Sequence, residues 1–253
     1  MKELSRLHKQ KGFTLVELAI VLVIIGLLIG GILKGQQLID NARVTAQMTQ
    51  FQGLQAAETS FQDAYSGLPG DVPSVATRVP NMAATTCDGN GDGIVGVTPG
   101  DTTTPPANLY TSATGTENIC FFTELTEAGY LSGVSNPYGA LNSTATTTIV
   151  FGGNVPQSKL GSGLLVSNVT AAGTNWSGLY TFDTMSTADP STTLGQNSMT
   201  PGQAAQIDRK MDDGNPTTGS VLGIGNTANC MTNATGYVEA STSNDCDVGF
   251  KLN

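Results

Sequence analysis

The stretch Lys11–Leu33, KGFTLVELAIVLVIIGLLIGGIL, decides the fold of this chain. It contains one acidic residue, Glu17, and no charge from Leu18 to Leu33. At ~1.5 Å per residue, residues 13–33 form a helix of about 30 Å, which is the thickness of the hydrocarbon core of a bilayer. The apolar run is too long for a cleaved secretory signal, and no small-residue cleavage pattern follows it. We therefore expect one transmembrane helix over residues 13–33.

Charge is divided unevenly along the sequence. The first twelve residues carry a net charge of +3, whereas the remainder has seven basic and nineteen acidic residues, a net charge of −12. Positive charge before a membrane helix favours a cytoplasmic N-terminus, so the rest of the chain is expected outside. An acidic body argues against nucleic acid and anionic lipid as its partners, and we predict no nucleic-acid binding.

The helix is expected to continue beyond the membrane, over residues 34–66. The sequence contains no proline before Pro69, and Leu54, Ala57 and Phe61 form an apolar stripe at helical spacing. Gly67 is expected to cap the helix just before Pro69 ends it.

Residues 67–253 are expected to form a globular body that packs against this second half of the helix. Apolar spacing predicts a helix over Glu117–Leu131 and a short helix over Pro201–Met211. The predicted strands are Thr147–Phe151, Gly163–Val169, Leu179–Phe182, Val221–Ile224 and Asp247–Leu252. The expected fold class is therefore α+β, with a long N-terminal helix on an antiparallel sheet.

The four cysteines, Cys87, Cys120, Cys230 and Cys246, all follow the apolar segment. A chain exported to an oxidising compartment is expected to form two disulfides from them. Four cysteines allow three connectivities. The pairs 87–120 and 230–246 are favoured because shorter loops close at a lower entropic cost.

The sequence CDGNGDGIVG, Cys87–Gly96, is the one motif typical of metal binding. Asp88, Asn90 and Asp92 alternate as in the first half of a calcium-binding loop, and the Ile94 carbonyl takes the next place. The glutamate that should complete the site is replaced by Pro99, so that Asp101 is the nearest acid. The alternative is a turn rich in Asp, Asn and Gly without an ion. Calcium is the one cofactor predicted, and none is expected to be required.

Catalytic motifs are missing from the sequence. Its single histidine, His8, lies among the first twelve residues, which excludes a histidine-based triad in the remainder. The glycines at 89, 91 and 93 lie among acids that repel phosphate. We therefore expect that the protein is not an enzyme.

The segment KQKGFTLVELAIVLVIIGLLIGGIL, residues 9–33, closely resembles the class III signal of type IV prepilins and type II secretion pseudopilins. The resemblance implies that residues 1–12 are a leader, which prepilin peptidase removes by cutting between Gly12 and Phe13. It also implies that the new amine of Phe13 is methylated. The LPGD sequence at residues 68–71 is similar to the segment that follows the long helix in this family. A pilin-like fold is therefore implied.

Glu17 lies four residues after Phe13, on the same helix face. In an array of such helices, its carboxylate can reach the Phe13 amine of a neighbouring copy, and low dielectric strengthens that pair. The resemblance implies a single-pass precursor in a bacterial inner membrane, then a filament in the periplasm or at the cell surface. Its expected partners are copies of itself, other pilins, prepilin peptidase and the inner-membrane assembly platform.

Two functions follow from this resemblance. The first is a structural subunit of a type IV pilus-like filament. The alternative is a type II secretion pseudopilin, or a minor pilin whose body is a ligand-binding or adhesive module. A pilus, a secretion pseudopilus and a DNA-uptake filament are not distinguished by the sequence.

Overall fold

The computed structural model describes residues 12–82, 87–93, 95, 117–134, 151–153, 155–161, 163–168, 180–185, 199–225, 229–232 and 236–251. The chain divides into two compact units, Met1–Ala42 and Arg43–Asn253, and each is described by itself. Of the expected leader, residues 1–12, only Gly12 is among the described residues.

Helix α1, Leu15–Tyr65, is the long helix expected from the sequence. It ends where Ser66 adopts a left-handed conformation, with φ of 53°, and the Arg78 side chain donates a hydrogen bond to the Tyr65 carbonyl. The expectation that Gly67 caps the helix was wrong, because the left-handed turn falls one residue earlier. A left-handed residue after the last turn and a basic side chain on the last carbonyls both satisfy a helix C-terminus.

One face of α1 is buried within the second unit. The buried residues recur at helical spacing and are Val44, Gln47, Phe51, Leu54, Ala57, Glu58 and Phe61. The stripe predicted at residues 54, 57 and 61 is therefore correct but begins ten residues earlier, at Val44. Phe51 stacks on Phe250, with ring centroids 5.8 Å apart, so that α1 packs directly on the central sheet.

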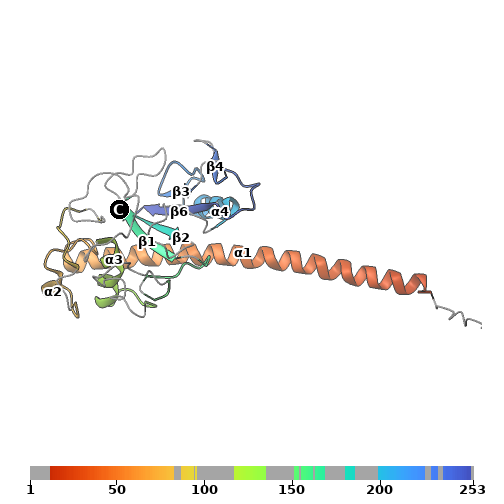
Figure 1. Ribbon diagram of the computed structural model, residues 1–253, viewed down its shortest axis with the longest axis horizontal. Coiled ribbons are helices and arrows are strands. Elements are labelled where there is room, and N and C mark those ends of the chain that lie inside the picture. Colours follow the sequence, from red (N-terminus) through yellow and green to blue (C-terminus); the bar gives the residue numbers. More distant parts are fainter. Residues whose placement is uncertain are drawn as a thin grey trace, which may run out of the picture. The chain divides into compact units, whose positions relative to one another are not determined.

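The sheet is antiparallel and four-stranded. Its strands are β1 (Gly163–Asn168), β2 (Tyr180–Met185), β3 (Val221–Gly225) and β6 (Cys246–Lys251), in the order β1-β2-β6-β3 (Figure 1). A second, two-stranded sheet joins β4 (Met231–Thr232) to β5 (Gly236–Tyr237). The strands predicted near residues 163, 179, 221 and 247 are confirmed. Of the fifth, 147–151, residues 147–150 lie outside the described residues, and Phe151 forms an isolated bridge with Val155.

Three further helices complete the described part of the chain. They are α2 (Val75–Arg78), α3 (Glu117–Glu127) and α4 (Pro201–Met211). Helix α3 ends four residues before the predicted Leu131, because the chain turns at Gly129, which has φ of +80°. Helix α4 has the predicted bounds and begins with a capping box between Thr200 and Gln203.

Two disulfides join elements of the body. Cys87 pairs with Cys120 across a Cα–Cα distance of 5.4 Å, and Cys230 pairs with Cys246 across 5.0 Å. The first connects the glycine-rich loop to α3, and the second connects the segment before β4 to β6. This long apolar helix, antiparallel sheet and pair of disulfides confirm the α+β fold class.

Candidate functional site

The predicted cleavage point lies just before α1. Residues 12–14 have no helical structure and are exposed, with Phe13 87% accessible. Apart from its two chain neighbours, no described residue comes within 4 Å of the place where a Gly12 Cβ would lie. A peptidase acts on extended backbone that it can surround. The Gly12–Phe13 peptide bond lies outside the helix, which begins only at Leu15, and both residues are exposed.

Thr14 and Glu17 close the first turn of α1 with a reciprocal pair of hydrogen bonds. The backbone N–H and the hydroxyl of Thr14 both donate to Glu17 Oε2, each at 2.8 Å. In return, the Glu17 N–H donates to the Thr14 hydroxyl oxygen at 3.3 Å. This arrangement is a capping box, and it also places an acidic side chain at the positive end of the helix dipole.

The capping box changes the expected role of Glu17 in the single chain. From the sequence, the Glu17 carboxylate was expected to pair with the Phe13 amine of a neighbouring copy. Instead, its carboxylate already accepts two hydrogen bonds from Thr14. The signal for this was present, because TLVE at residues 14–17 is a Thr-x-x-Glu pattern before an apolar run.

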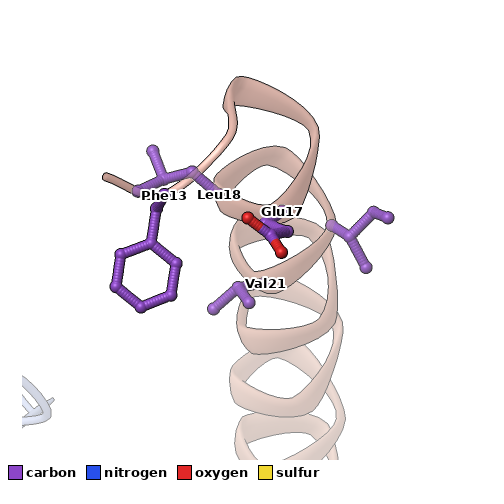
Figure 2. A pocket seen from close by; sticks show the side chains of 5 residues that line it. Phe13, Glu17, Leu18 and Val21 are labelled. Atoms are coloured by element: carbon purple, nitrogen blue, oxygen red, sulfur yellow. The ribbon is translucent and has the colours of Figure 1, made fainter. Parts of the chain in front are cut away.

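The helix that follows is apolar on every side. An 18-residue window of it has a mean hydropathy of 2.8, and none of that window is buried. A hollow of about 570 Å³ at its start is lined by Phe13, Glu17, Leu18, Ile20 and Val21. Figure 2 shows the Phe13 ring beside the helix, near Glu17 and Val21. The Glu17 carboxylate, which is expected to pair with an amine of another copy, therefore lies beside apolar side chains. An ion pair is strongest in apolar surroundings of low dielectric.

A second cluster of polar groups surrounds Asp71, directly after the LPG turn. Its Oδ1 accepts the Gly91 N–H at 2.6 Å, and its Oδ2 accepts the Gly93 N–H at 2.8 Å. The backbone also approaches closely here, since a Cβ on Gly89 would lie 2.2 Å from the Asp71 carbonyl carbon. The carboxylate of Asp71 thus organises the glycine-rich loop through its amide groups.

The predicted calcium ligands are only partly described by the structure. Asp88 Oδ1 accepts the Val75 N–H at 2.9 Å, at the start of α2. Asn90 and Asp92 bond to each other, with Asn90 Nδ2 donating to Asp92 Oδ2 at 2.8 Å. Ile94 and Asp101 lie outside the described residues. The loop therefore holds its shape through its own hydrogen bonds and through Asp71, and the calcium site stays a prediction.

Calorimetric titration of the purified chain with Ca²⁺ tests that prediction. We expect heat of binding that is lost in Asp92→Ala, because Asp92 offers the exposed carboxylate of the predicted set. Asp245→Ala, which removes an acid near β6, is the matched control and should bind as the unmodified chain does. Absence of heat from the unmodified chain would show that the loop is a turn without an ion.

Glu124 of α3 is a fully buried acid beside this loop. Its Oε2 accepts the Gly70 N–H at 2.7 Å, and its Oε1 is buried and makes no hydrogen bond with any described residue. Burial raises the pKa of Glu124 to about 9, and the hydrogen bond from Gly70 opposes this rise only in part. The nearby carboxylates of Asp71, Glu117 and Asp88 raise that pKa further. At neutral pH the folded protein therefore holds Glu124 in its neutral form.

The raised pKa of Glu124 predicts that the free energy of unfolding depends on pH. Because the pKa of Glu124 is raised from 4.5 to about 9 on folding, its contribution is present below pH 4.5 and is lost as the pH rises toward 9. The free energy of unfolding should fall by at most about 1.4 kcal/mol per pH unit across that interval. The Glu124→Gln side chain still accepts the Gly70 N–H but does not titrate. In this variant the plot of unfolding free energy against pH should therefore be flatter between pH 6 and pH 9.

Urea unfolding at several pH values measures this difference. Glu127→Gln, on the same helix, is the control and should retain the slope of the unmodified chain. An equal slope in Glu124→Gln and the unmodified chain would mean that Glu124 does not carry the buried proton.

A third group of acids follows α4. The carboxylates of Asp208, Asp212 and Asp213 lie within 4.8 Å of one another. Asp208 accepts hydrogen bonds from the Tyr237 hydroxyl at 2.9 Å and the Gly214 N–H at 3.0 Å, while burial raises its pKa to about 6. Burial and the adjacent Asp208 also raise the pKa of Tyr237.

The other two acids of this group shape the turn between α4 and β3. Asp212 accepts the Ser220 and Val221 N–H groups, and Asp213 accepts the Asn215 N–H. Their carboxylates are thus used in capping and turn formation.

The first unit combines an exposed apolar helix with an accessible non-helical segment before it and a carboxylate in its first turn. These features are compatible with a precursor that is anchored in a membrane by its N-terminal helix. The chain carries the prokaryotic N-terminal methylation motif, whose family model matches residues 7–33. This motif is the class III signal of type IV pilins and pseudopilins, which confirms the resemblance. Comparison with curated proteins and with solved structures finds no match.

Proposed function

We propose that this chain is a structural subunit of a type IV pilus-like filament that assembles from the bacterial inner membrane. The observation that carries the proposal is the methylation motif at residues 7–33, which leads directly into a helix with a fully exposed apolar surface. A helix of this kind needs lipid or other helices around it. The membrane supplies the first environment, and a bundle of copies supplies the second.

Processing prepares the helix for assembly. Prepilin peptidase hydrolyses the Gly12–Phe13 bond on the cytoplasmic side, which removes the basic leader and leaves an amine on Phe13. The same enzyme transfers a methyl group to this amine. The positive charge of the leader, which holds the N-terminus inside the cell, is replaced by one positive charge at the helix start.

Assembly then gives Glu17 a new partner. In the single chain, its carboxylate accepts hydrogen bonds from Thr14. In the filament, the Phe13 amine of a neighbouring copy lies beside Glu17, and an ion pair replaces or joins the bonds within the capping box. Because an ion pair in low dielectric is far more favourable than either charge alone, the pairing selects a defined stagger between copies.

The chain without its leader, about 240 residues with two disulfides, favours a pilus subunit over a small major pseudopilin. The proposal includes no enzymatic activity, no required cofactor and no nucleic-acid partner. Its partners are copies of the same chain, other pilins, prepilin peptidase and the assembly platform.

Electron microscopy of filaments sheared from the cell surface, labelled with antibody against this chain, tests the proposal. We expect label along the filaments and a mature N-terminus at a methylated Phe13 by mass spectrometry. A working form that keeps residues 1–12 would contradict it. Filaments that persist without the chain, combined with loss of adhesion or secretion, would support the minor-pilin or pseudopilin alternative.

A further inference from the structure

The glycine-rich loop contains the one asparagine of the sequence that is followed by glycine, Asn90 before Gly91. Both residues are exposed to solvent. An Asn–Gly pair can cyclise, because glycine has no side chain that would keep the asparagine amide carbon away from its nitrogen. Nothing in the proposed assembly uses this pair, so its chemistry is a separate property of the body.

A carboxylate holds the hydrogen of the Gly91 nitrogen. Asp71 Oδ1 accepts the Gly91 N–H at 2.6 Å, and Oδ2 of the same carboxylate accepts the Gly93 N–H at 2.8 Å. The carboxylate is thus fixed by two contacts, and Asp71 is only 3% exposed. Gly91 also packs closely on Pro73, since a Cβ at position 91 would lie 2.9 Å from Pro73 Cγ. A carboxylate held at hydrogen-bond distance from a nitrogen is placed to take its proton.

The side-chain amide of Asn90 is held at both of its polar atoms. The Asp92 N–H donates to Asn90 Oδ1 at 2.9 Å, and Asn90 Nδ2 donates to Asp92 Oδ2 at 2.8 Å. The first of these bonds forms an Asx turn, which folds the asparagine side chain back over the peptide that follows it. The same N–H donates to the oxygen on which negative charge develops when the amide carbon is attacked. The nitrogen, the base and the amide are therefore organised in one short loop.

We propose that Asn90 and Gly91 cyclise in the folded protein, with Asp71 as the base, so that the loop converts its own asparagine to aspartate or isoaspartate. The Gly91 nitrogen bonds to the Asn90 amide carbon while Asp71 takes the hydrogen of this nitrogen, which closes a succinimide ring. The bond from that carbon to Nδ2 breaks with its electron pair on Nδ2, which takes a proton from solvent and leaves as ammonia. Asp71 returns its proton to solvent. The reaction needs only the folded loop and does not depend on the proposed function.

Water then opens the succinimide at one of its carbonyl carbons. Attack at the former side-chain carbonyl restores the backbone and leaves an aspartate, whereas attack at the backbone carbonyl leaves an isoaspartate with a longer backbone. Either product adds a negative charge between Asp88 and Asp92. The aspartate gives the predicted calcium loop an unbroken Asp-x-Asp-x-Asp pattern, which has more charge for a cation. The isoaspartate instead displaces Gly91 from Asp71.

Asn215 is a matched control within the same chain. Its Oδ1 accepts the Thr217 N–H at 3.2 Å, which is the same type of turn. The residue that follows it is Pro216, whose nitrogen carries no hydrogen and cannot form the ring. Asn215 should therefore stay intact under conditions that convert Asn90.

Incubation of the full, detergent-solubilised chain in heavy-oxygen water at neutral pH measures the reaction. We expect peptide mass spectrometry to find an acid that carries heavy oxygen at residue 90, and an unchanged amide at Asn215. Conversion of Asn90 should be roughly ten-fold faster in the folded chain than in urea, because folding positions the reacting groups. If Asn90 stays intact in the folded chain but converts in urea, the proposal is overturned, because the loop then holds the reacting atoms apart.

Asp71→Asn tests the base. Its amide oxygen still accepts an N–H, but it does not take up the proton. The folded variant should convert Asn90 about a hundred-fold more slowly than the unmodified chain, as expected for loss of a positioned base, whereas the two chains should react equally fast in urea. Near-ultraviolet circular dichroism shows whether the variant is folded, and the comparison of the unmodified chain with and without urea does not depend on it. An equal or faster rate in the folded variant would overturn the role of Asp71.

Discussion

A Glu17→Ala chain is expected to reach the membrane, lose its leader and fail to enter filaments. The substitution removes the acidic side chain of the first part of α1 and leaves the apolar surface unchanged. Insertion depends on that surface, whereas the proposed contact between copies depends on the carboxylate. The processed subunit should therefore accumulate in the membrane, while the sheared surface fraction falls to background.

Glu17→Gln separates the two roles that the structure gives to Glu17. Glutamine at this position preserves a capping box with Thr14, because its amide oxygen accepts the same N–H. It carries no charge and cannot form an ion pair with an amine. We expect Glu17→Gln to fail as completely as Glu17→Ala, although its helix start remains intact.

Thr14→Ala is the complementary control. It removes the hydroxyl that donates to Glu17 and accepts the Glu17 N–H, but it keeps the carboxylate. If charge pairing drives assembly, this chain should still form filaments. Quantitative blotting of membrane and sheared fractions measures all three variants. Filaments at the normal level from Glu17→Gln would show that capping, and not charge, is the role of Glu17.

The elements of this fold were predictable where they depend on neighbours in the sequence. The length and apolar character of α1, the start of α4 at Thr200-Pro201 and the alternating strands follow from local patterns. The Thr14–Glu17 capping box also follows from a local pattern, the Thr-x-x-Glu sequence before an apolar run. The end of α1 is less predictable, since Ser66 takes a left-handed conformation although Gly67 is adjacent.

Contacts between distant residues were not predictable from the sequence. The amide groups of Gly91 and Gly93 donate to Asp71, which lies 20 and 22 residues earlier, and the loop motif at residues 88–92 gives no indication of this contact. No local pattern distinguishes an aspartate that ends a turn from one that organises another loop. The burial of Glu124 was hidden for the same reason, because nothing in the sequence of α3 distinguishes a buried acid from one on the solvent-facing side of the helix. The packing of α3 within the body determines that Glu124 is buried, and this burial raises the pKa of its carboxyl group.

Gly70, whose N–H donates to Glu124, is the subject of the second large prediction. Gly70 has φ of +87°, and a Cβ at this position would lie 2.2 Å from the Glu117 carbonyl oxygen. It would also lie 3.2 Å from the Phe121 backbone nitrogen. Both neighbours are backbone atoms of α3, which is fixed to the glycine-rich loop by the Cys87–Cys120 disulfide. The clash cannot be relieved by a side-chain rotation, so α3 must move away from the turn.

Gly70→Ala is therefore expected to destabilise the body by more than about 4 kcal/mol, the range reached when strain is combined with displaced core packing. Gly129→Ala separates the two causes. Gly129 has a similar φ, +80°, but within the described part of the chain no atom beyond its adjacent residues lies within 4 Å of its Cβ position. Gly129→Ala should lower the free energy of unfolding by only about 1–2 kcal/mol, which is the cost of the left-handed conformation alone.

Urea unfolding of the detergent-solubilised chains, followed by near-ultraviolet circular dichroism, compares these variants. The signal reports aromatic packing in the body and is insensitive to the helical content of the membrane segment. Equal losses in the two variants would mean that backbone strain accounts for both, and that α3 does not press on the turn at residues 68–71. A much larger loss in Gly70→Ala would establish that close packing between this turn and α3 holds the end of α1 in the body.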